Sequence, residues 1–85
     1  MPTVLKFLSY RVVIHTNDHR PCHVHVYPKA GGVAEFWLDC PGGPPHPKLI
    51  SKGIPKVVAL RIQKHLAEHL AELCAAWRKI HVDYR

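Results

Sequence analysis

The first half of the chain consists of short segments in which β-branched and aromatic residues dominate or alternate with polar ones. This pattern is typical of β-strands, whose side chains repeat with a period of two. The expected strands span residues 3–7, 10–15, 23–27 and 33–38. Residues 8–9 and 28–32 would form the turns of two β-hairpins, and residues 17–21 would link them. We therefore predict a four-stranded antiparallel sheet.

Helical periodicity marks the second half of the chain. Residues 41–47 are rich in proline and glycine, so they should form an irregular connection and not a strand or a helix. From Val58 to Ile80, apolar residues recur at steps of three and four. This spacing predicts one amphipathic helix from about Pro55 to residue 81, capped by Ser51 or Gly53.

Packing this helix on one face of the sheet gives an α+β fold, a single small domain over residues 1–85. If residues 23–27 pair with residues 33–38 around Ala30, His23 lies opposite Trp37 and His25 lies opposite Glu35. The helix should cover the apolar face and leave His65 and His69 on its own solvated flank. The helix-free face of the sheet would then carry Lys6, Arg11, Val13, His15, His23, His25, Tyr27, Glu35 and Trp37.

Composition adds charge and histidine to this picture. Twelve Lys and Arg against six Asp and Glu give a net charge of +6, and there are eight histidines. Such a surface suits phosphate groups or an acidic partner, although it also serves solubility alone. No apolar stretch reaches the roughly 18 residues that span a bilayer, and no secretory signal pattern is visible, so we expect a cytoplasmic protein without membrane contact. Three cysteines at wide spacings predict reduced thiols, with Cys40 in an exposed loop and Cys74 packed on the helix face.

Residues 17–26, which read NDHRPCHVHV, hold the densest candidate chemistry. His23 and His25 are two residues apart on a strand, so their rings should point to one side and Cys22 to the other. Two imidazoles plus one further nitrogen or oxygen donor form a set that zinc accepts. The sequence supplies no definite third ligand, so we expect no cofactor and keep zinc at His23 and His25 as the alternative. In the plainest interpretation both are solvated strand residues, with His25 paired to Glu35.

A metal-independent ribonuclease would use the same histidines. Cleavage of RNA needs a base for the 2′-hydroxyl, an acid for the leaving oxygen and cations for the phosphate, and imidazoles titrate in a suitable range. The candidate catalytic residues are His19, His23 and His25. The candidate nucleic-acid-binding residues are Lys6, Arg11 and Arg20 for phosphate and Tyr27 and Trp37 for base stacking. Alternatively, this face packs against a partner protein.

Several segments resemble a bacterial family catalogued as domain of unknown function four-one-six-zero. The most specific is the string N-D-H-x-P-x-H-V-H-V at residues 17–26, accompanied by residues 1–5, residues 35–39 and the Ala76-Trp77 pair. Cys22 departs from the family pattern, in which a second proline is usual. Family members are commonly small stand-alone proteins, often encoded beside another small protein, and such pairs are suspected toxin–antitoxin systems. The resemblance implies a toxin-like or partner-binding role.

Three functional hypotheses follow. The first is the toxin-like component of a bacterial toxin–antitoxin-type pair, acting on RNA or a nucleic-acid-bound target through the histidine cluster, with a small cognate protein encoded nearby as its partner. The second is a non-enzymatic module that binds protein or nucleic acid, including a second copy of itself in a homodimer. The third is a small metal-binding domain with histidine ligands.

Overall fold

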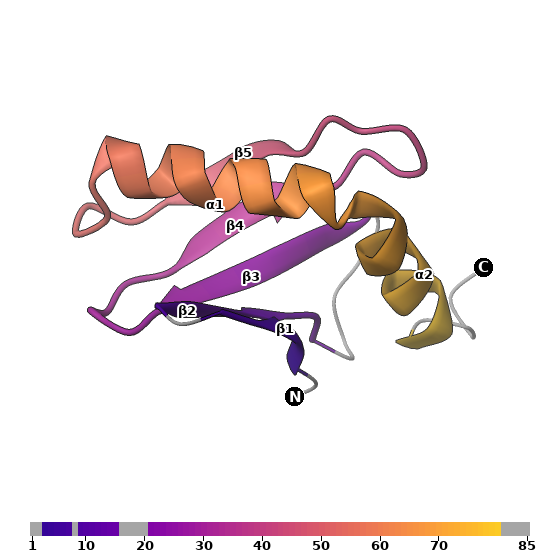
Figure 1. The fold of residues 1–85 in the computed structure, drawn as a ribbon, viewed down its shortest axis with the longest axis horizontal. Coiled ribbons are helices and arrows are strands. Elements are labelled where there is room, and N and C mark those ends of the chain that lie inside the picture. Colours follow the sequence, from indigo (N-terminus) through magenta and orange to yellow (C-terminus); the bar gives the residue numbers. More distant parts are fainter. Residues whose placement is uncertain (1–2, 8, 16–20, 81–85) are drawn as a thin grey trace.

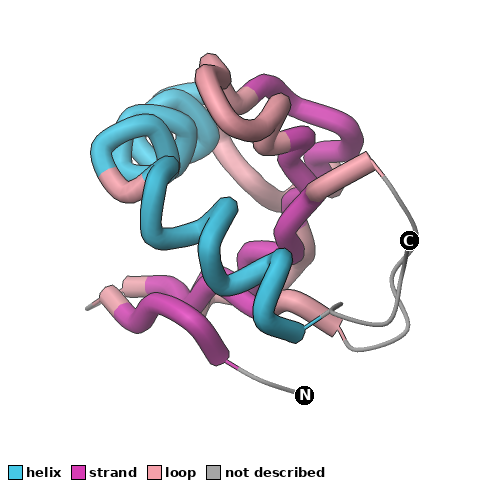
Figure 2. The backbone as a smooth tube through the Cα atoms, turned by 90° about the vertical axis from the view of Figure 1, so that its right-hand side faces the viewer, coloured by secondary structure: helices cyan, strands magenta, loops and turns pink. Residues whose placement is uncertain are grey.

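The computed structural model describes residues 3–7, 9–15 and 21–80 as an α+β fold. Five antiparallel strands form one sheet in which the spatial order follows the chain (Figure 1). Two helices follow the last strand, and the second turns away from the axis of the first (Figure 2). The elements are β1 (Thr3–Lys6), β2 (Tyr10–Val13), β3 (His23–Pro28), β4 (Ala34–Trp37), β5 (His46–Ile50), α1 (Lys56–Glu68) and α2 (Leu70–Ile80).

The register of both predicted hairpins is confirmed. In the second hairpin His23 lies opposite Trp37 and His25 lies opposite Glu35. In the first hairpin Lys6 lies opposite Arg11, as a turn at residues 8–9 requires, and the register shifts only further along, between β1 residues 3 and 5. The alternation of side chains therefore assigns the two faces of the sheet largely as the sequence predicts.

The prediction of four strands is wrong, because β5 pairs with β4 along the edge of the sheet. Residues 46 and 47 belong to this strand and not to an irregular connection. Proline has no N–H to donate to a neighbouring strand, so it is tolerated at a sheet edge or beside an irregularity. Pro47 has both conditions: it lies on the edge strand, opposite Phe36, where the register of the pair shifts.

The prediction of one long helix is also wrong. The helix breaks at His69, whose backbone (φ −113°, ψ 19°) separates α1 from α2. Pro55 occupies the N-terminal cap position of α1, with no side-chain hydrogen bond to the helix. Ser51 does not cap the helix; its hydroxyl accepts a hydrogen bond of 3.0 Å from the backbone N–H of Val33. That bond ties the β3–β4 loop to the segment that precedes α1.

The hydrophobic core lies between the sheet and the two helices. The apolar face of β2, β3 and β4 meets Ile62 and Leu66 of α1 and Leu73 and Trp77 of α2. Val13 departs from its predicted exposure, since it is fully buried although it belongs to the opposite face. The fully buried sheet residues on the helix side are Val12, Ile14, Val24, Val26, Ala34, Phe36 and Leu38.

His65 does not lie on a solvated flank as predicted. Its ring stacks on Phe7 with centroids 4.9 Å apart, and its Nδ1 is hydrogen-bonded to the hydroxyl of Tyr10. His69, by contrast, is only half-buried and contacts Glu72 on the next turn, with Nδ1 3.0 Å from Oε1. These two histidines therefore differ: His65 joins the edge of the core, and His69 contacts a carboxylate near the surface.

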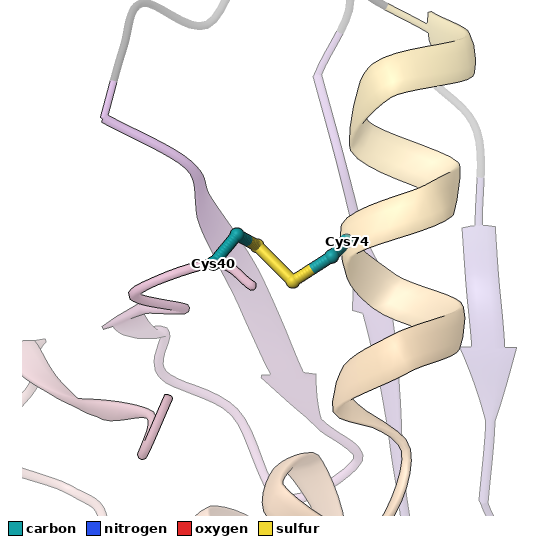
Figure 3. The surroundings of a disulfide bond; sticks show 2 residues. All are labelled: Cys40 and Cys74. Atoms are coloured by element: carbon teal, nitrogen blue, oxygen red, sulfur yellow. A yellow bond between two sulfur atoms is a disulfide. The ribbon is translucent and has the colours of Figure 1, made fainter. Parts of the chain in front are cut away.

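The expectation of three reduced thiols is wrong for two of them. Cys40, just after β4, forms a disulfide with Cys74 of α2 (Figure 3). Cys74 is 2% exposed, so the bond lies at the boundary of the core and not at the surface. Cys22, the third cysteine, packs partly buried against the core, on the side of β3 that the alternation predicts. The disulfide fastens the second helix to the end of the β3–β4 hairpin.

Neither of the two described helices combines the length and the apolar character needed to cross a membrane.

Candidate functional site

Polar and aromatic side chains gather on the sheet face that the core does not use. Successive residues of a strand point to opposite sides, so His23, His25 and Tyr27 of β3 share this face. Arg11 lies opposite Tyr27 on β2, and Glu35 lies opposite His25 on β4. Three neighbouring strands thus place cationic, aromatic and acidic groups side by side.

These groups contact one another in sequence across the sheet. The guanidinium of Arg11 lies 5.1 Å from the ring centroid of Tyr27, and the hydroxyl of Tyr27 lies 3.0 Å from Nε2 of His15. The ring of His15 meets that of His25 edge to face, with centroids 4.3 Å apart. We call Arg11, Tyr27, His15, His25 and Glu35 the histidine–aromatic band.

The acidic end of the band is shared between two partners. Nε2 of His25 lies 3.4 Å from Oε1 of Glu35, which confirms the predicted pairing of these two residues. The ammonium group of Lys48 on β5 lies 3.1 Å from the same oxygen and 5.4 Å from the ring centroid of Trp37. The carboxylate of Glu35 is therefore held between an imidazole and an ammonium group, with its side chain only 18% exposed.

His23 is not displayed at the surface as predicted. It is 7% exposed, because its ring lies between Trp37 of β4 and Trp77 of α2, at centroid distances of 5.6 and 5.4 Å. The break between the helices brings α2 to this end of the sheet. Nδ1 of His23 lies 2.9 Å from the carbonyl oxygen of Pro21. A carbonyl oxygen can only accept, so Nδ1 of His23 is the donor in this hydrogen bond.

His23, His25 and Glu35 form a group with the composition of a metal site. One ligand atom from each residue lies within 4.8 Å of the other two. Glu35 supplies the oxygen donor that the sequence did not identify as a third ligand. Cys22 does not belong to this group, because it faces the core.

A cavity of about 340 Å³ opens at the end of the sheet next to the band. The two turns that flank β2 and β3 meet here, joined by a 2.9 Å hydrogen bond from the Lys29 backbone N–H to the Ser9 carbonyl. Among the residues that the structure describes, the lining includes three cations and two tyrosines and no acidic residue. Its residues are Lys6, Phe7, Tyr10, Arg11, Tyr27, Pro28 and Lys29.

The structure brings together part of the predicted nucleic-acid site. Lys6, Arg11 and Tyr27 all line this cavity, whereas Trp37 lines a separate hollow of about 230 Å³ with Pro21, Asp39 and His46. His19 and Arg20 lie outside the described residues. The sequence prediction missed Phe7 and Lys29 as lining residues. These two residues line the cavity because two turns that are distant in sequence lie side by side, and the sequence of either turn alone does not predict this.

Burial of Tyr10 changes its acidity. The residue is 4% exposed, and burial raises the pKa of Tyr10 to about 12. The positive charge of Arg61 opposes this shift in pKa, and the negative charge of Glu68 adds to it. The hydroxyl of Tyr10 is thus held in its neutral form at the wall of the cavity, so the three cations are the charged groups there.

Comparison with known protein families gives a match over most of the chain. The sequence model of the family described as "Domain of unknown function (DUF4160)" matches residues 9–78. This range covers β2 to β5, α1 and most of α2, including the whole histidine–aromatic band. Neither a curated protein nor a solved structure matches the chain.

Proposed function

The chain belongs to the DUF4160 family, and we propose that it is the toxin-like component of a bacterial toxin–antitoxin-type pair that binds single-stranded RNA at its basic cavity. The observation that carries the RNA-binding part of this proposal is the lining of that cavity, where Lys6, Arg11 and Lys29 lie beside aromatic residues. Single-stranded RNA presents both phosphates and exposed bases, which such a combination of cations and rings recognises.

The placement of the cations supports an anionic ligand. Lys6 and Arg11 are directly opposite each other on β1 and β2, and both are exposed. Like charges that face each other across an antiparallel pair destabilise the sheet. A phosphate group between them would remove this repulsion. Lys29 approaches the same cavity from the adjacent turn.

Cleavage of the bound RNA is a second candidate activity. Two imidazoles that exchange protons with the 2′-hydroxyl and the leaving oxygen suffice for cleavage without a metal. The observation that favours cleavage, within the described part of the chain, is a pair of neighbouring imidazoles. The rings of His15 and His25 lie 4.3 Å apart, beside Tyr27, which lines the cavity. The predicted roles of His19, His23 and His25 as catalytic residues belong to this candidate. RNA hydrolysis in the presence of EDTA that is lost in His15→Ala and His25→Ala would support it, and intact RNA would refute it.

A small cognate protein is the proposed partner. Val57 and Leu60 of α1 are 62% and 56% exposed and lie three residues apart, so they project from neighbouring positions of the helix. We propose that the partner, encoded nearby, covers these two side chains. Co-expression with the neighbouring gene product should yield a complex of the two proteins. Val57→Glu and Leu60→Glu should each abolish that complex. A complex unaffected by both changes would place the partner elsewhere, and a dimer of this chain would point to self-association.

The experiment that tests RNA binding compares cations at and away from the cavity. Lys6→Ala and Arg11→Ala should each weaken binding of a fluorescent single-stranded oligoribonucleotide several-fold. Each should also reduce the slope of log K against log salt by about 0.7 for every phosphate that the variant no longer neutralises. Lys64→Ala on α1 is the matched control: it removes the same charge from an exposed residue that does not line the cavity. The proposal fails if all three variants bind alike or if the wild-type protein does not bind.

A further inference from the structure

We propose that His23, His25 and Glu35 form a binding site for a divalent transition-metal ion of the zinc class. The three side chains converge from β3 and β4 on the face opposite the core. Two imidazole nitrogens and one carboxylate oxygen are donors that zinc and its neighbours in the first transition row accept. Magnesium and calcium prefer sites made of oxygen alone, so this donor set selects against them.

The distances suit a tetrahedral ion. Zinc bonds of 2.0–2.2 Å place two ligands of a tetrahedral site roughly 3.3 Å apart. Nε2 of His25 and Oε1 of Glu35 already lie 3.4 Å apart. The three ligand atoms all lie within 4.8 Å of one another, so closing the site needs a movement of at most about 1.5 Å, which rotation of the His25 and Glu35 side chains provides.

The surroundings of His23 fix the ring in the form that a metal needs. Its Nδ1–H donates to the carbonyl oxygen of Pro21. In the neutral tautomer with this proton on Nδ1, the lone pair that binds a metal is on Nε2. Metal-binding histidines commonly donate their other N–H to a carbonyl or carboxylate in this way, because the bond sets both tautomer and orientation. Trp37 and Trp77 both contact the same ring, with centroid distances of 5.6 and 5.4 Å. The His23 side chain would therefore lose little conformational freedom when an ion binds.

Two features define how the site would work. Three protein ligands leave the fourth position of a tetrahedral ion for water or an exchangeable ligand, as in catalytic zinc sites. Lys48 shares Oε1 of Glu35 and competes with a cation for this carboxylate. Removing the ammonium group in Lys48→Met should therefore tighten metal binding.

This inference does not rest on the proposed RNA-binding function. Lys6 and Arg11 are not members of the ligand group. Lys6→Ala and Arg11→Ala should therefore weaken RNA binding and leave zinc binding unchanged. Conversely, Glu35→Gln should impair zinc binding and spare the basic cavity, so the failure of one proposal is distinguishable from the failure of the other.

The experiment uses the untagged full chain with the Cys40–Cys74 disulfide intact and Cys22→Ser as background, which removes the remaining thiol as a competing ligand. Zn²⁺ is titrated against a chromophoric chelator, and Co²⁺ is added separately to report tetrahedral geometry by its absorption. We expect tight binding of one Zn²⁺ per chain at this site and no competition by Mg²⁺. His25→Ala and Glu35→Gln should each weaken that binding at least tenfold and remove the rise in Tm that Zn²⁺ gives.

The matched control is a second histidine–glutamate pair, formed by His69 at the break between the helices and Glu72 of α2. His69 and Glu72 lie 3.0 Å apart, as close as the proposed ligands, and belong to no third-ligand group among the described residues. His69→Ala and Glu72→Gln should therefore leave zinc binding unchanged. The proposal is overturned if the protein does not bind Zn²⁺, or if Glu35→Gln binds it as tightly as Glu72→Gln. Glu35→Gln is nearly isosteric, so it decides the question even if His25→Ala does not fold.

Discussion

At the scale of single residues, side chains of one type have very different surroundings. His23 lies between two tryptophans, His25 contacts Glu35, and His65 stacks on Phe7. Only the first two occupy the open face of the sheet. The described histidines therefore do not form one cluster: His23 and His25 belong to the candidate ligand group on the sheet, whereas His65 of α1 packs at the edge of the core.

Tyr10 gives a prediction for alkaline pH. Its pKa is raised from 10.0 to about 12, so the folded state holds the phenolic proton more tightly than the unfolded state does. The resulting stability is fully present below pH 10 and is lost as the pH rises from 10 to 12. A shift of about two units corresponds to about 2–3 kcal/mol.

The measurement is the free energy of unfolding of the wild-type protein and of Tyr10→Phe between pH 8 and pH 12. The difference between the two proteins should shrink or reverse in favour of Tyr10→Phe across this interval. Curves that remain parallel would show that the phenol of Tyr10 does not contribute.

At the scale of elements, connections decide how the sheet and helices fit together. The loop between β3 and β4 contains Gly32 at φ +86°, a backbone conformation that residues other than glycine rarely adopt. A Cβ there would also lie 2.5 Å from Oγ of Ser51. Because Ser51 accepts the backbone N–H of Val33, this crowding would disturb the bond that joins the hairpin to the approach of α1.

Gly32→Ala should therefore destabilise the fold by about 2–3 kcal/mol, the sum of a left-handed backbone cost and one disturbed hydrogen bond. Gly53→Ala is the control, since a Cβ at Gly53 meets no atom within 4 Å and its φ is not positive. Denaturant unfolding measures both. Equal stability of the two variants would contradict the role assigned to the loop.

The disulfide between Cys40 and Cys74 gives a second prediction at this scale. It closes a loop across a sequence separation of 34 residues. Restricting the unfolded chain by a loop of this length stabilises the folded state by about 3–4 kcal/mol. Cys40→Ser should lower the free energy of unfolding by this amount, and reduction of the wild-type protein should have the same effect. If reduction leaves the stability of the wild-type protein unchanged, the disulfide is not what fastens α2.

The sequence predicted some elements well and others poorly, for identifiable reasons. The pairing of His25 with Glu35 was predicted because residues 23–27 alternate strictly between imidazoles or tyrosine and valine. A slip of one residue would turn the imidazoles toward the core and the valines away from it, so the alternation selects one register. β5 was missed because it contains Pro47 and is mostly exposed, so it has no alternating pattern. The break at His69 was missed because the apolar spacing continues from Leu66 to Leu73 across it.

At the scale of the whole molecule, function depends on contacts between parts that are distant in sequence. The sequence identified Lys6, Arg11 and Tyr27 as members of one surface, and the structure places all three around one cavity. It did not foresee that Trp77 would cover His23, because that contact requires the helix to bend at the end of the sheet. It also did not pair Cys40 with Cys74, since three cysteines at wide spacings specify no pairing.

The chain carries a net charge of +6, but the proposed RNA-binding cavity lies at one end of the sheet. The most direct test is to add a short single-stranded oligoribonucleotide to isotopically labelled protein and to follow the backbone amide resonances by NMR. The largest shift changes should fall on Lys6, Arg11, Tyr27 and Lys29, and they should diminish as salt is raised. Changes centred instead on the hollow beside Trp37, or spread evenly over all exposed lysines and arginines, would contradict the account.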